Sequence, residues 1–230
     1  MPVETIEPLP RLLSLAVHEL RTPVTVVAGY LRMLLREQGG PLNDRQRKML
    51  DEAERSCGRL AALVAEMSDL GKLESGAASL AQQDVDVAGL LGELASGMHE
   101  GEDRGVQLEL RCTESPVVVS GDRARLAAAL TSLMHAALRE RGEPGAGVVQ
   151  CSTINTVDGA RCAVVAIGDQ TELPALIAHA TRDTPPFDEW RGGLGLALPV
   201  ARRVIEGHGG RLWSADGARA ASALRLPLRT

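Results

Sequence analysis

Aromatic side chains are nearly absent from this chain of 230 residues and make up only 2% of it. The four rings belong to Tyr30, Phe187, Trp190 and Trp213. Proteins that bind single-stranded nucleic acid stack bases on several exposed rings, so we expect no such function. The net charge of −5 also argues against binding to a phosphate backbone. The core must therefore be built from Leu, Val, Ala and Met.

Long apolar runs and paired cysteines are missing as well. No stretch approaches about 18 uncharged apolar residues, so we expect no transmembrane helix. The segment MPVETIEPLP has no basic region followed by an apolar one, and we expect no signal peptide. Cys57, Cys112, Cys151 and Cys162 form no CxxC pair and fit no zinc spacing. We expect reduced thiols inside or beside the core of a cytoplasmic protein, and no metal site.

Two amphipathic helices are predicted within residues 1–75, separated by a break at 38–43 that ends in a plausible N-cap, Asn43. The apolar or small residues of the first helix are Leu13, Ala16, Leu20, Val24, Val27, Leu31 and Leu34. Those of the second are Met49, Ala53, Ser56, Leu60, Leu63, Met67 and Leu70. One antiparallel hairpin cannot cover both stripes, so we expect two copies to pair as a four-helix bundle, a homodimer.

Residues 76–230 mix short strand signals with helices. The predicted strands are 85–87, 106–110, 117–119, 148–156, 161–167, 211–214 and 223–228, and the predicted helices are 90–98, 123–139 and 194–206. Asp158 and Gly159 predict a hairpin turn, and residues 170–192 are expected to be irregular. The chain is therefore predicted to be of the α+β class: a helical hairpin followed by an α/β sandwich with helices on one face of a mixed sheet.

The sequence HELRTP at residues 18–23 combines groups that suit nucleophilic chemistry. His18 points away from the apolar stripe, where a neutral imidazole can act as a nucleophile. Glu19 can accept its proton, and Thr22 lies one turn further on, where its hydroxyl can orient a water. Pro23 is expected to kink the helix. A HExxH zinc site is excluded because Thr22 stands where the second His would be.

HELRTP and the apolar run before it resemble the H-box of bacterial sensor histidine kinases. Residues 14–35, and the second helix through MSDLGKLESG, are similar to that family's dimerisation and phosphotransfer domain. The resemblance implies that His18 is the phosphoacceptor and that Glu19 assists phosphotransfer. It also implies that Thr22 supports phosphatase activity toward a partner response regulator.

The remainder resembles the ATP-binding domain of the same family. Its glycine cluster, which includes Gly193 and Gly195 at the start of a predicted helix, is similar to the G2 box; such glycines expose backbone N–H groups to phosphate. The segment FDEW at 187–190 is similar to the F-box. The resemblance implies that Asp169 contacts the adenine amino group and that Arg139 meets a phosphate.

Several positions depart from that family's pattern. Ser132 and Ala136 stand where two asparagines are expected, and the second asparagine would hold magnesium. Asp-x-Gly-x-Gly is replaced by DQTEL at 169–173, so both glycines are lost. We therefore expect binding of ATP and Mg²⁺ to be weak or absent.

Three functions are compatible with these observations. The first is a two-component signalling protein that carries a phosphoryl group on His18 and exchanges it with an aspartate of a response regulator receiver domain. The second is an active, ATP-dependent sensor histidine kinase. The third is a non-catalytic pseudokinase scaffold. The intact HELRTP favours the first over the third, and the lost magnesium ligand favours the first over the second.

Overall fold

The computed structural model describes residues 9–99, 102–157, 159–181, 184–214 and 221–229. The chain divides into two compact units, of which one ends at Ala78 and the other begins at Ser79. No helix among the described residues is long and apolar enough to cross a membrane. The same residues contain no group of three or more His, Cys, Asp or Glu side chains that could hold a metal ion.

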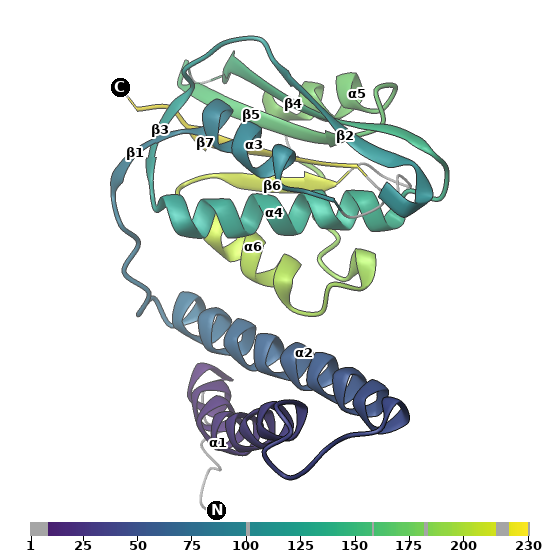
Figure 1. The fold of residues 1–230 in the computed structure, drawn as a ribbon. Helices are drawn as coiled ribbons and strands as arrows, with labels where there is room; N and C mark the ends of the chain where they lie inside the picture. The colour runs from purple at the N-terminus through teal and green to yellow at the C-terminus, as the bar shows by residue number, and fades with distance from the viewer. Residues whose placement is uncertain (1–8, 100–101, 158, 182–183, 215–220, 230) are drawn as a thin grey trace, which may run out of the picture. The chain divides into compact units, whose positions relative to one another are not determined.

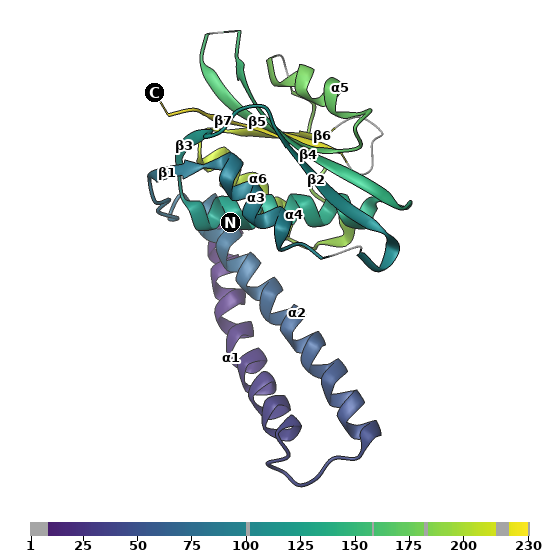
Figure 2. The ribbon, with the colours of Figure 1, turned by 45° about the horizontal axis from the view of Figure 1, so that its top comes forward.

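The first unit is a hairpin of two long helices, α1 (Leu9–Leu35) and α2 (Asp44–Glu74) (Figure 2). Asn43 begins α2 with a capping box, as predicted for an N-cap. Its side chain accepts a hydrogen bond from the Gln46 amide at 2.9 Å, and the Gln46 side chain accepts one from the Asn43 amide at 3.0 Å. Helix α1 continues through Pro23, so the predicted kink does not end the helix.

The contact between α1 and α2 follows a heptad pattern that is offset from the predicted stripes. On α2 the inward residues Leu50, Cys57, Val64 and Gly71 recur every seven positions, and the last three are buried. Among the side chains of residues 11–35 in α1, Val17 alone is buried, with 4% of its surface exposed. Much of each predicted stripe consequently faces solvent in a single copy.

The second unit is built on a mixed sheet with the strand order β2-β4-β5-β7-β6 (Figure 1). Strands β2 and β4 are parallel, the other neighbours are antiparallel, and β1 pairs with β3 as a separate ribbon. The strands are β1 (Gln83–Asp86), β2 (Val106–Cys112), β3 (Val118–Gly121), β4 (Gly145–Asn155), β5 (Arg161–Gly168), β6 (Arg211–Ser214) and β7 (Ser222–Pro227). The predicted hairpin turn between β4 and β5 includes Asp158, which lies outside the described residues.

Helices cover both faces of this sheet, whereas the sequence predicted only one covered face. Helices α3, α4 and α6 lie on one side and α5 on the other (Figures 1 and 2). The helices are α3 (Val87–Ser96), α4 (Arg123–Glu140), α5 (Leu173–Ala178) and α6 (Ala197–Gly207), with 3-10 turns η1 (Glu102–Arg104), η2 (His179–Thr181) and η3 (Arg191–Gly193). Helix α5 falls in the segment expected to be irregular.

Packing against the far side of the sheet explains α5. Leu173 and Leu176 join a buried cluster with Val164 and Trp213. The indole N–H of Trp213 donates to the carbonyl of Leu176 at 3.1 Å. A helix of six residues is not stable by itself, so its formation depends on these tertiary contacts.

The four cysteines are free thiols, as expected, and only Cys112 is exposed. Cys112 and Cys151 lie opposite each other on β2 and β4. Burial raises the pKa of the Cys151 thiol to about 12, so this sulfur is a poor nucleophile at neutral pH.

Candidate functional site

His18 lies on the outer side of α1, with 80% of its side chain exposed. Its Nδ1 is 3.3 Å from Oε1 of Glu19, whose side chain is 72% exposed. This contact favours a proton on Nδ1 and leaves the lone pair of Nε2 available, since a neutral imidazole carries only one N–H. The sequence therefore located a histidine that is accessible and next to a carboxylate.

Thr22 is also exposed, one helical turn after His18. Pro23 has no N–H to donate to the carbonyl of Glu19, so that carbonyl lacks its usual partner in the helix. The hydroxyl of Thr25 donates to the carbonyl of Arg21 at 2.8 Å. The backbone next to His18 is thus polar and open to water.

A groove of about 760 Å³ runs beside His18 between α1 and α2. It is lined by three basic side chains, Arg11, Arg21 and Lys72, and by no acidic one. Gly71, a buried residue of α2, also lines the groove. Sequence reasoning missed the basic residues, although the spacing of Arg11, His18 and Arg21 would have placed them on one helix face.

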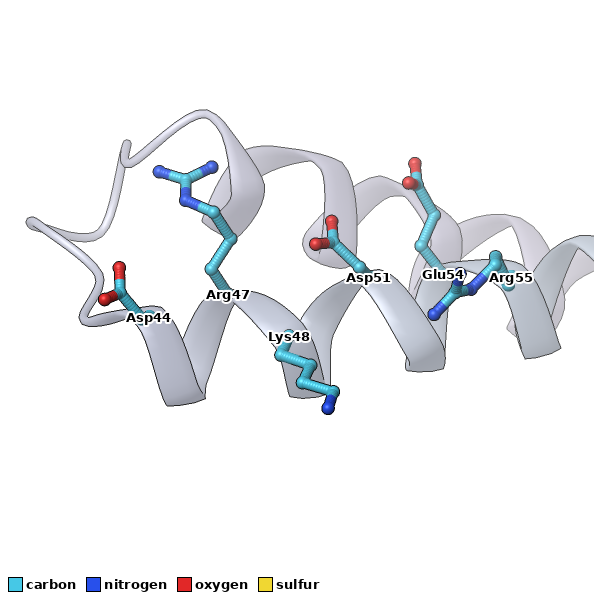
Figure 3. Close-up of a pocket in the computed structure, with 6 residues that line it drawn as sticks. All are labelled: Asp44, Arg47, Lys48, Asp51, Glu54 and Arg55. Carbon is cyan, nitrogen blue, oxygen red and sulfur yellow. The ribbon is translucent and has the colours of Figure 1, made fainter.

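A second hollow, of about 510 Å³, lies at the start of α2 (Figure 3). All of its lining side chains are charged and both signs are present: Asp44, Arg47, Lys48, Asp51, Glu54 and Arg55. None of the predicted site residues lines this hollow.

In the second unit, Asp169 lies directly after β5 and forms an ion pair with Arg141, the residue that follows α4. The remaining cavity beside them has a volume of about 10 Å³. That is room for at most about one water molecule. The carboxylate predicted to contact adenine therefore already has a basic partner from the chain itself.

The glycine cluster lies against the middle of α4. Gly192, Gly193 and Gly195 have φ angles of +69°, +60° and +62°, a conformation that favours glycine. A Cβ atom at Gly192 would lie 3.2 Å from both Cα and Cβ of Ala136. Ala136 is fully buried, so the position where a magnesium ligand was expected is closed by backbone. Arg139 is exposed on the same helix.

Leu173 explains the loss of the second glycine of the expected Asp-x-Gly-x-Gly pattern. This side chain is 2% exposed and belongs to the core cluster under α5. Arg225 fixes the end of this segment by donating to the carbonyl of Ala180 at 2.6 Å. The chain after Asp169 is therefore held on the face of the sheet opposite α4.

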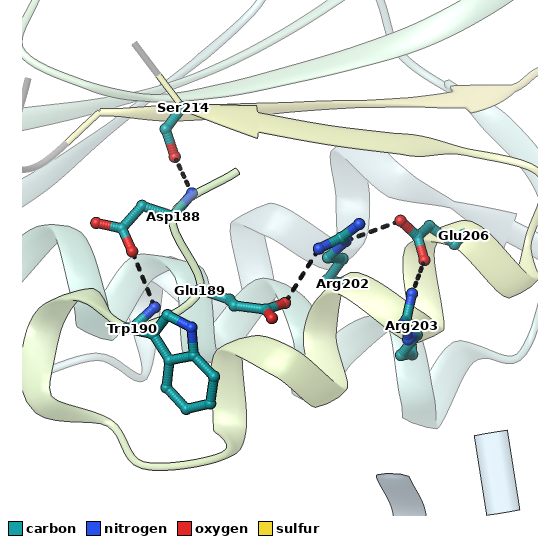
Figure 4. Close-up of polar contacts among 7 residues, drawn as sticks. All are labelled: Asp188, Glu189, Trp190, Arg202, Arg203, Glu206 and Ser214. Atoms are coloured by element: carbon teal, nitrogen blue, oxygen red, sulfur yellow. Dashed lines mark hydrogen bonds and ion pairs between the residues drawn. The ribbon is translucent and has the colours of Figure 1, made fainter. Parts of the chain in front are cut away.

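The segment 187–190 is fixed to the second unit by polar contacts (Figure 4). The Asp188 amide donates to Oγ of Ser214 at 3.2 Å, and the Trp190 amide donates to the Asp188 side chain at 3.0 Å. Glu189 pairs with Arg202 of α6 at 3.3 Å. The indole of Trp190 stays outside this network, and Trp190 is 72% exposed.

The same network continues along α6 to Glu206. Burial opposes its charge, yet hydrogen bonds from Arg202 and Arg203 hold the pKa of the Glu206 carboxyl below its usual value. Their distances are 2.9 and 2.7 Å. The glycine-rich segment thus lies between two segments held by polar contacts, residues 187–190 and helix α6.

Comparison with known protein families identifies the first unit. The family model for the His Kinase A (phospho-acceptor) domain matches residues 10–76. Sensor protein DivL of Caulobacter vibrioides is 29% identical over 198 residues, which cover 84% of this chain and 24% of DivL. The phosphate regulon sensor protein PhoR of Pseudomonas aeruginosa is 29% identical over 201 residues, or 85% of this chain and 44% of PhoR. The chain thus spans less than half the length of these relatives.

Two solved structures have the same fold. Full-length ShkA, crystallised in complex with AMPPNP, matches with a TM-score of 0.72 and 22% identity over 96% of this chain and 46% of ShkA. The Acinetobacter baumannii histidine kinase AdeS matches with a TM-score of 0.59 and 19% identity over 93% of this chain and 98% of AdeS.

The contact between Ala136 and Gly192 generates a prediction about Ala136→Asn. This change places an amide at the expected magnesium position but forces it into a filled space, which costs about 1–3 kcal/mol. We expect a lower midpoint of urea unfolding and no gain of Mg²⁺-dependent nucleotide binding. Ser132→Asn, at a partly exposed position, should cost less. A stable Ala136→Asn variant that binds Mg²⁺ and nucleotide would contradict the closed site.

Proposed function

We propose that the chain is the core of a bacterial sensor histidine kinase, with a His Kinase A domain followed by an ATPase-like domain, and that it carries a phosphoryl group on His18. It exchanges this group with the aspartate of a response regulator receiver domain. ATP-dependent phosphorylation of His18 is weak or absent. Residues 1–75 form the phosphotransfer domain and residues 76–230 the ATP-binding-like domain, a division supported by the two compact units.

The observation that carries this proposal is the pairing of Nδ1 of His18 with Glu19 beside a basic groove. In the transfer, the Nε2 lone pair attacks the phosphorus of an aspartyl phosphate. The bond from phosphorus to the aspartyl oxygen breaks, and the carboxylate leaves. His18 becomes a cation that keeps its proton on Nδ1, and the Glu19 carboxylate stabilises that charge. The reverse reaction returns the phosphoryl group to the receiver domain.

The basic side chains of the groove contribute positive charge to the transfer and form no covalent bond in it. Arg11, Arg21 and Lys72 place three basic groups along the groove next to His18. Phosphoryl transfer depends mostly on positioning and on stabilisation of negative charge, so these groups favour a doubly charged phosphoryl group at Nε2. Thr22 is placed to orient a water for hydrolysis of the aspartyl phosphate, which makes it the residue of the phosphatase reaction.

The filled ligand positions of the second unit support the proposal that the phosphoryl group comes from a donor other than ATP. Asp169 is paired with Arg141, Ala136 is packed against Gly192, and Leu173 is buried on the opposite face of the sheet. Nucleotide contacts proposed for Gly193, Gly195 and Arg139 would therefore lack an open pocket for the base and a magnesium ligand. Because this arrangement disfavours ATP, we propose that a phosphorylated receiver domain donates the phosphoryl group.

The exposed apolar side chains of the hairpin support a homodimer. In α1 they include Leu20, Val27 and Leu34, and in α2 Leu60 and Leu63, all between 38% and 52% exposed. They belong to the predicted stripes that the single hairpin leaves uncovered. A second copy would bury both stripes in a four-helix bundle.

Phosphoryl exchange is tested directly with a receiver domain that already carries labelled phosphate on its aspartate. We expect the label to appear as acid-labile phosphohistidine on the wild-type chain and to be absent from His18→Ala. Thr22→Ala should keep the transfer and lower the release of free phosphate. Arg32→Ala, at an exposed position in the last turn of the same helix, is the matched control. A chain that leaves every receiver domain of its source labelled would contradict the proposal.

Dimerisation is tested by Leu60→Glu, which places a charge in the proposed seam. We expect the wild-type chain to sediment as a dimer in analytical ultracentrifugation and the variant as a monomer, because a buried unpaired charge is costly. Arg59→Ala, at the exposed neighbouring position, should remain a dimer. A monomeric wild-type chain at tens of micromolar, or a dimeric Leu60→Glu variant, would exclude this seam.

A further inference from the structure

The backbone of Arg141 is fixed at the end of α4. Its backbone amide donates to the carbonyl of Ala137 at 3.2 Å, and Arg104 donates to its carbonyl at 3.0 Å. The side chain is 19% exposed, and its Nη1 pairs with Oδ1 of Asp169, which is 46% exposed. The guanidinium thus lies between the end of α4 and the end of β5.

The surroundings of this ion pair have the chemistry of a ligand pocket. The cavity is walled by apolar side chains that include Leu108, Leu138 and Ile167, and Asp169 is its acidic group. Apolar walls with one carboxylate suit a flat heterocycle that donates a hydrogen bond from an exocyclic amino group. The planar guanidinium of Arg141 offers the same kind of donor to the same carboxylate.

Arg141 is not fully satisfied in this position. Its Nε is buried and has no hydrogen-bond partner within the part of the chain that the structure describes. A buried donor without an acceptor costs free energy. The contact with Asp169 consequently carries most of the attraction, and Asp169 remains partly open to water, which weakens the pair. Displacement of the side chain is therefore inexpensive.

We propose that Arg141 is an internal latch that occupies the pocket beside Asp169 and competes with an adenine-type base for this carboxylate. When the latch is closed, the cavity holds about 10 Å³. When Arg141 leaves, Asp169 and the apolar walls form a slot for the base alone, because Ala136 and Gly192 still fill the expected magnesium position. This inference does not depend on phosphoryl transfer through His18.

Adenosine is the probe that isolates this pocket, because it carries no phosphate. We expect Arg141→Met to bind adenosine about tenfold more tightly than the wild-type full chain in calorimetric titrations. An ion pair that keeps a pocket closed nine-tenths of the time lowers the apparent affinity by about that factor. Guanosine should gain nothing, since it presents a carbonyl oxygen to the Asp169 carboxylate where adenosine presents an amino group.

Two further variants make the test specific. Arg123→Met removes an arginine from the first turn of the same helix and should leave adenosine binding unchanged. Asp169→Asn in the Arg141→Met background should abolish the gain. Arg141→Gln is measured in parallel, and circular dichroism checks that each variant is folded. The result then does not depend on the folding of a single variant. Unchanged adenosine affinity in folded Arg141→Met and Arg141→Gln, or an equal gain for guanosine, would overturn the latch. Neither result would affect the transfer assay with a receiver domain.

Discussion

Helix α4 packs against the sheet and against α6, and eight of its side chains are buried. Asp122 caps its first turn by accepting from the Arg125 amide at 3.1 Å, a hydrogen bond that holds the pKa of this carboxyl below its usual value. His208, just after α6, accepts from the Asp122 amide at 2.9 Å. The position of α4 is therefore fixed at its start. This position decides which residues lie next to Ala136 and Arg141. This packing closes both the position where a magnesium ligand was expected and the pocket expected for the base.

In contrast to α4, the helices of the hairpin leave much of their apolar surface uncovered. Its helices bury little apolar surface against each other, and the seam that includes Leu20 and Leu60 stays open in one copy. His18 lies outside both the intrachain contact and that seam, beside a groove with three basic residues. The transfer proposed for His18 thus uses an exposed surface of the hairpin. The two units therefore differ: His18 is exposed on the hairpin, whereas the chain's own side chains fill the expected ligand positions of the second unit.

Helical spacing was sufficient to predict the hairpin, because residues three and four apart on α1 and α2 decide which face is apolar, and Asn43 with Gln46 marks where α2 begins. The resemblance to histidine kinases located His18 and Asp169. It did not reveal that Asp169 pairs with Arg141, 28 positions away, because a charge pattern does not say which oppositely charged side chains meet. Helix α5 was missed for a similar reason: it is stabilised by Trp213, 37 positions after Leu176. Contacts between residues far apart in the chain produce no periodic pattern in the sequence, so they could not be predicted from it.

The central claim is that the phosphoryl group on His18 comes from a partner and not from ATP. The most direct measurement incubates the purified chain with γ-labelled ATP and Mg²⁺ and quantifies acid-labile label, with His18→Ala as the reference. The account predicts no more label on the wild-type chain than on His18→Ala. Strong labelling that disappears in His18→Ala would show that the second unit still delivers ATP to His18, and would contradict the account.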